Sequence, residues 1–110
     1  MKIENKENYV IISDTESNIV SFIEEFSQEY NTIAQYHLVL NLFDNESITL
    51  ENLKLFTDLS KTHKKARKSF VIVAKNINFN KISVKMTVVP SLQEAQDIIE
   101  MEAIERDLGF

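Results

Sequence analysis

Two runs of β-forming apolar residues constrain the fold of this chain more than any other feature. HLVLNLF covers residues 37–43 and SFVIVAK covers residues 69–75. Neither run alternates strictly between apolar and polar residues, which is typical of parallel strands covered by helices on both faces. The segment between them predicts a helix from about Leu50 to Arg67, with Thr49 as its N-cap. The residues expected to form its buried stripe are Leu53, Phe56 and Leu59. A strand–helix–strand unit of this kind should have a right-handed crossover.

The segment before this unit predicts a hairpin and a helix. Residues 9–13 (YVIIS) form a short β-rich run that Lys2–Glu4 can pair with across a turn. Asp14 or Thr15 is the expected N-cap of the following helix. The apolar residues of that helix recur at three- and four-residue spacing: Ile19, Phe22, Ile23, Phe26 and Tyr30.

The segment after the unit predicts an edge strand and a last helix. Residues 84–89 (VKMTVV) alternate and stop at Pro90, as suits a strand near a sheet edge. Ser91 and Glu94 form a capping-box pattern that opens the last helix. We therefore predict one α/β domain over residues 1–110, with a mixed, mostly parallel sheet of about 4–5 strands and about 3–4 helices.

Composition narrows the classes of function. The chain has no cysteine, which excludes disulfides, thiolate catalysis and cysteine metal sites. No apolar run approaches the roughly 20 residues needed to span a bilayer, and the first ten residues lack the apolar core of a secretion signal. We therefore expect a cytoplasmic protein that does not engage a membrane.

The positive charges are concentrated in one short segment of a chain whose net charge is −5. This candidate basic patch contains Lys61, Lys64, Lys65, Arg67 and Lys68. It could serve a nucleic-acid-associated accessory function, but cations in a last helical turn also complement the helix dipole. Aromatic residues for base stacking are not interleaved with the patch. Together with the negative net charge, this favours the structural explanation, and we do not expect nucleic acid to be the partner.

No pattern for catalysis is visible. The two histidines, His37 and His63, lack the spacing of a metal site. With one glycine in the chain, a glycine-rich phosphate-binding loop is also excluded. We therefore expect no enzyme activity, no cofactor and no metal.

The last helix is apolar on two sides. One stripe should pack on the sheet and contains Leu92, Ala95, Ile98, Ile99 and Ala103. A second stripe on roughly the opposite side contains Met101, Ile104 and Leu108, followed by Phe110. A helix that is apolar on two sides needs two neighbours. The second stripe is expected either to pack on another part of the domain or to bind a partner, including a second copy in a homodimer.

This order of elements, with the closing stretch VVPSLQEAQDII (88–99), resembles the STAS domain. That family includes bacterial anti-sigma-factor antagonists and the cytoplasmic domains of sulphate transporters. The resemblance covers essentially the whole chain and implies a regulatory module that binds a protein. In the antagonists, the second helix begins with Asp-Ser-Ser-Gly, and phosphorylation of the serine switches binding.

When the flanking apolar positions are aligned, this motif corresponds to residues 49–52 of the chain. Leu50 stands in place of the switched serine and Asn52 in place of the glycine. Glu51 is either a fixed charge that imitates the phosphate or simply a good residue for a helix start. The resemblance thus implies a candidate interaction turn without the usual phosphoserine, formed by Ser47, Thr49, Leu50, Glu51 and Asn52. Ser47 and Thr49 carry the hydroxyl groups available for modification.

The chain is also similar to short bacterial proteins that are sometimes catalogued as ribonuclease Z. That enzyme is a two-zinc hydrolase whose ligands centre on His-x-His-x-Asp-His. This chain has no such motif, so we do not expect that chemistry.

Taken together, the sequence predicts a non-catalytic STAS-type protein-interaction module in the bacterial cytoplasm. The alternative is a small-ligand or lipid-sensing module of the same fold.

Overall fold

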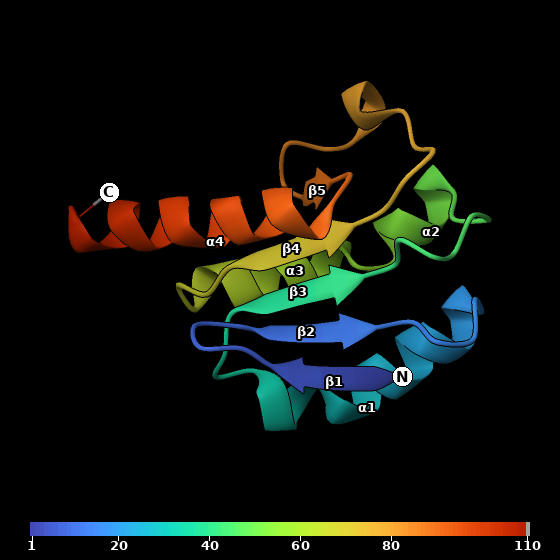
Figure 1. Ribbon diagram of the computed structural model, residues 1–110, viewed down its shortest axis with the longest axis horizontal. Coiled ribbons are helices and arrows are strands. Elements are labelled where there is room, and N and C mark those ends of the chain that lie inside the picture. Colours follow the sequence, from blue (N-terminus) through green and yellow to red (C-terminus); the bar gives the residue numbers. More distant parts are fainter. Residues whose placement is uncertain (110) are drawn as a thin grey trace.

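The computed structural model describes residues 1–109 and has one five-stranded sheet with helices on both faces. The strands lie in the order β1-β2-β3-β4-β5, with β1 antiparallel to β2 and the other three pairs parallel (Figure 1). The α/β fold class predicted from the sequence is therefore confirmed. The elements are β1 (Lys2–Asn5), β2 (Val10–Ser13), α1 (Ile19–Ile33), β3 (Leu38–Asn41), α2 (Leu50–Lys54), α3 (Thr57–Lys65), β4 (Phe70–Val73), the 3₁₀ turn η1 (Phe79–Lys81), β5 (Thr87–Val89) and α4 (Leu92–Asp107).

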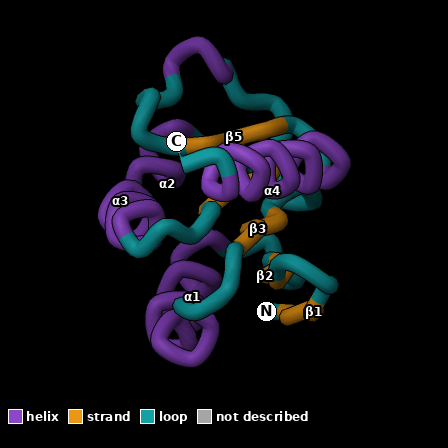
Figure 2. The backbone as a smooth tube through the Cα atoms, turned by 90° about the vertical axis from the view of Figure 1, so that its left-hand side faces the viewer, coloured by secondary structure: helices purple, strands orange, loops and turns teal. Residues whose placement is uncertain are grey.

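The three central strands, β2, β3 and β4, are apolar on both faces, as predicted for the two runs that contain β3 and β4. Their side chains alternate between the faces. One face contributes Val10, Ile12, Leu38, Leu40, Phe70 and Ile72 to a large core shared with α1, α2 and α3. The other face contributes Ile11, Val39, Val71 and Val73 to a smaller core shared with α4. Figure 2 shows α1 and α3 on one side of the sheet and α4 on the other.

Helix α4 covers only part of its face. It packs on β4 and β5 through Ala95 and Ile99, both buried. Its carboxyl half extends beyond the amino ends of β3 and β4 (Figure 1). Nine of its 16 residues are exposed to solvent.

The predicted helix over residues 50–67 is two helices. After α2 the backbone tightens, since the amides of Leu55 and Phe56 donate to the carbonyls of Asn52 and Leu53, three residues earlier. Helix α3 then begins at Thr57 and ends at Lys65. The kink keeps both Leu53 and Phe56 in the core.

The N-cap of α1 also differs from the prediction, because Asn18 and not Asp14 or Thr15 accepts the hydrogen bond from the Ser21 amide. Asp14 is used elsewhere: its carboxylate accepts from the Glu16 amide and from the Asn45 side chain. The N-caps Thr49 and Ser91 are confirmed, as is the edge position of β5.

Phe26 lies at the centre of the larger core. It is fully buried, and its ring centroid lies 6.0–6.3 Å from those of Phe22, Tyr30, Phe56 and Phe70. Replacing Phe26 with Ala should lower the free energy of unfolding by about 3–5 kcal/mol, because transfer and cavity costs add. Urea denaturation measures this loss. The exposed Val20→Ala, also in α1, should change stability by no more than about 0.5 kcal/mol. A loss for Phe26→Ala as small as that of the control would contradict this view of the core.

Candidate functional site

The turn between β3 and α2 is ordered by its own side chains. The Asn45 carboxamide is buried, accepts from the Ser47 amide at 3.0 Å and donates to Asp14 at 3.2 Å. The Thr49 hydroxyl accepts from the Asn52 amide, while the Asn52 side chain accepts from the Thr49 amide. Asn52, which stands where the STAS motif has glycine, thus completes a capping box.

The residues of the candidate interaction turn divide between solvent and a pocket. Ser47, Thr49 and Glu51 are exposed. Leu50 instead lines a pocket of about 210 Å³ between α2 and the segment that follows η1. Its other apolar lining residues are Leu53, Ile82 and Met86. The sequence did not predict this pocket, because it joins segments about 30 residues apart whose approach depends on the chain path.

The second apolar stripe of α4 lies in solvent. The exposed fractions are 54% for Met101, 60% for Ile104 and 65% for Leu108. Of the two alternatives for this stripe, packing on another part of the domain is therefore wrong. Phe110 lies outside the described residues.

The candidate basic patch divides into two groups. Arg67 and Lys68 line a pocket beside α4, whereas Lys61 and Lys65 line a shallow pocket with Lys85; Lys64 lines both. The Lys64 ammonium donates to the Lys85 carbonyl at 3.2 Å and to the Thr87 hydroxyl at 3.0 Å. Lys64 thereby joins α3 to the segment around β5.

His63 is a buried structural residue. Its Nε2 lies 2.7 Å from the Tyr36 carbonyl, which can only accept, so Nε2 carries the proton. Its Nδ1 then accepts from the Tyr30 hydroxyl at 2.8 Å. Burial lowers the pKa of His63 below its ordinary value, and the Tyr36 carbonyl partly opposes this shift. The neutral ring holds α1, α3 and the segment before β3 together.

His37 is also neutral, and nearby cations add to the effect of burial. The Ser69 amide donates to its Nδ1 at 2.9 Å, so Nε2 carries the ring proton. Burial and the nearby charges of Arg106 and Lys68 lower the pKa of His37. Arg106 Nη2 lies 3.4 Å from Nε2, but both atoms are donors, so this contact is not a hydrogen bond.

No protein-family model matches this sequence, and a search of curated proteins finds no significant match. Within residues 1–109, no helix is long and apolar enough to cross a bilayer. The same residues contain no cluster of three or more His, Asp or Glu side chains arranged to hold a metal ion.

The neutral histidines predict a pH-dependent stability. Because the pKa of folded His63 is lowered, unfolded His63 takes up a proton at a higher pH than folded His63 does. The resulting stability is fully present above the unfolded pKa of about 6.5 and is lost as the pH falls below it. His37 acts in the same direction. The free energy of unfolding, from urea denaturation, should therefore fall between pH 7.5 and 5.5.

A His63→Phe variant separates this effect from other titrations. It removes the ionisable group and should reduce the pH slope, whatever its effect on stability at pH 7.5. An equal slope in wild type and variant, or a wild-type stability that rises on acidification, would contradict the assignment.

Proposed function

We propose that this chain is a non-catalytic protein-interaction module of STAS type, without phosphoserine control. Its partner binds the outer face of α4 and presents a basic amphipathic segment. The observation that carries this proposal is the exposed stripe of Met101, Ile104 and Leu108 on a helix whose opposite face is already buried.

The stripe forms a larger apolar surface than single exposed apolar residues do. Single exposed apolar residues are normal, but adjacent large ones are typical of interaction sites. The three side chains are spaced by three and four residues, so they form one ridge along the helix. Ridges of this spacing supply the anchors when a helix binds an apolar surface of a partner.

The charges around the stripe indicate the chemistry of the partner. Five exposed carboxylates lie on α4 outside its sheet-facing side: Glu94, Asp97, Glu100, Glu105 and Asp107. The one cation of the helix, Arg106, lines the pocket on the α3 side together with Glu105. Two α4 helices packed on each other would bring these carboxylates together, which disfavours a homodimer. A basic segment with apolar anchors would complement both the stripe and its charges.

A second candidate function rests on the pocket behind Leu50. Its volume of about 210 Å³ and its lining by Leu50, Leu53, Ile82 and Met86 favour a small apolar ligand. Native mass spectrometry of the purified protein tests this candidate. A co-purifying ligand that a Leu50→Arg variant loses would support it.

The proposed interface is tested by changing Met101, Ile104 and Leu108 together to Lys. This variant should remain folded, because the three side chains are exposed. Affinity capture from the source cell followed by mass spectrometry should recover a partner with wild type and not with the variant. Binding of a synthetic basic segment from that partner, measured by calorimetry, should weaken at least about a hundredfold, because several central anchors are lost.

The matched control places the same three charges on α1. Val20, Ser27 and Asn31 are exposed, and their change to Lys should leave partner binding intact. Equal loss in both variants would contradict the interface. A wild-type dimer that the α4 variant dissociates would replace the proposed partner with a second copy of the chain.

A further inference from the structure

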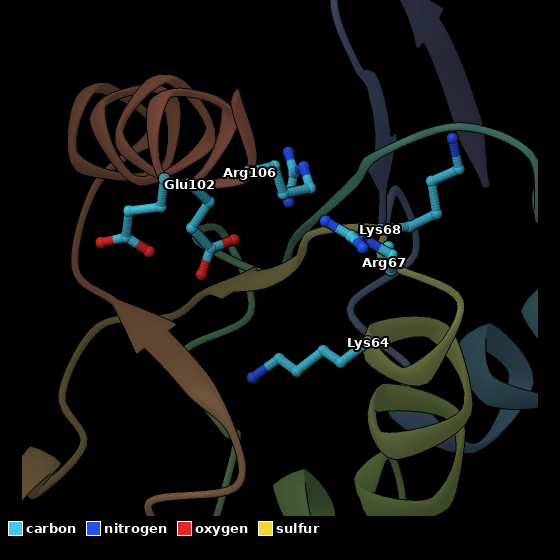
Figure 3. Close-up of a pocket in the computed structure, with 6 residues that line it drawn as sticks. Lys64, Arg67, Lys68, Glu102 and Arg106 are labelled. Atoms are coloured by element: carbon cyan, nitrogen blue, oxygen red, sulfur yellow. The ribbon is translucent and has the colours of Figure 1, made fainter. Parts of the chain in front are cut away.

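A second surface of the molecule gathers cations from two distant parts of the sequence. A pocket of about 260 Å³ lies between the carboxyl end of α3 and the carboxyl half of α4. Its lining residues are Lys64, Arg67, Lys68, Glu102, Glu105 and Arg106. In Figure 3, Arg67 and Arg106 approach from the α3 and α4 sides, and Lys64 extends below them. The side chain of Lys68 extends away from these three in this view.

The arginines of this pocket have few strong acceptors. None of the six lining residues forms an ion pair within 4 Å with another described residue. Arg106 Nη1 lies 3.4 Å from the Ser69 hydroxyl, and its Nη2 faces the protonated Nε2 of His37. That hydroxyl accepts a hydrogen bond from Nη1 and itself donates to the Glu102 carboxylate. Apart from this hydrogen bond, the guanidinium N–H groups of Arg106 have no acceptor among the described residues, and Arg106 lines the pocket.

Arg67 occupies a backbone position that suits glycine. The amide of Arg67 donates to the Lys64 carbonyl and that of Lys68 to the His63 carbonyl, which is the Schellman pattern at the end of α3. Arg67 accordingly has φ of +64°, in the left-handed region. Glycine is the usual residue there because any Cβ is strained. This chain has an arginine at that position, and the arginine side chain lines the pocket.

We propose that this pocket binds a small phosphorylated anion, with Arg67 and Arg106 as its two clamping residues and Lys64 as a third contact. Guanidinium groups suit this role because they donate paired hydrogen bonds to phosphate oxygens. Lys64 uses two of its three ammonium hydrogens on Lys85 and Thr87, which leaves one for a ligand.

The shape and charge of the pocket favour a compact anion over a polymer. Pockets for drug-sized ligands have volumes of about 300–1,000 Å³, so this pocket of about 260 Å³ suits a smaller molecule. Glu102 and Glu105 lie in its lining and would repel a phosphate backbone that continued past the two arginines. The site shares Lys64, Arg67 and Lys68 with the candidate basic patch but adds Arg106 from α4. None of its lining residues belongs to the stripe of Met101, Ile104 and Leu108.

Inorganic pyrophosphate is the probe for the experiment. Calorimetry and amide chemical-shift mapping at low salt should detect saturable binding, with the largest shifts at residues 64–69 and 102–106. Arg106→Gln and Arg67→Gln should each weaken binding about tenfold or more, because each removes charge-assisted hydrogen bonds. Lys61→Gln is the matched control: it removes the same charge from α3 but lies outside this pocket, and it should change affinity less than about twofold.

An Arg67→Gly variant separates a role of Arg67 in binding from a role in stabilising the fold. It should raise the melting temperature, because glycine relieves the left-handed strain, and should weaken pyrophosphate binding about as much as Arg67→Gln does. No saturable binding by wild type would overturn the proposal. An equal loss of pyrophosphate affinity in Lys61→Gln would also overturn it, because it would indicate nonspecific attraction to positive charge. Tighter binding of random RNA than of pyrophosphate, weakened by Lys61→Gln as well, would overturn it too.

Discussion

The structure depends on three adjacent parallel strands that are apolar on both faces. Val39 and Val71 point to one side of the sheet, and Leu38, Leu40 and Phe70 point to the other. Such strands cannot leave either face in water without exposing several large side chains. Helices α1, α2 and α3 cover one side, and the burial of Phe26 and Phe56 anchors them. The other side has α4, whose inner face carries Ala95 and Ile99.

This requirement also explains where surface remains for function. Helix α4 must be long enough to cover β4 and β5, yet only one of its faces meets them, so its outer face is free to carry Met101, Ile104 and Leu108. Its carboxyl half extends beyond the strands and reaches the end of α3, which brings Arg106 beside Arg67. One helix thus completes the core, presents an acidic apolar ridge and forms one wall of a cationic pocket.

The sequence predicted the features that depend on local pattern. The apolar runs at 37–43 and 69–75 and the capping residues Thr49 and Ser91 led to the right elements, and the two stripes of the last helix were visible from spacing. The kink after Leu55 was missed, since its hydrogen bonds carry no sequence signal of their own. The contacts among His37, Ser69 and Arg106 were also not predicted. These residues are far apart in the sequence and come together only because β3 and β4 are neighbours in the sheet and α4 packs beside them. The cations of residues 61–68 do not form one patch, since they line two pockets that share only Lys64.

The central claim is that α4 has an inner face that packs in the core and an outer face that is exposed to solvent. Two substitutions of the same chemistry, Ile99→Ala and Ile104→Ala, test it most directly through the free energy of unfolding. Ile99 is 2% exposed, and its truncation should cost about 2–5 kcal/mol. Ile104 is 60% exposed, and its truncation should change stability by no more than about 0.5 kcal/mol. Similar losses at the two positions would contradict the account, because the outer face would then already be packed within the folded chain.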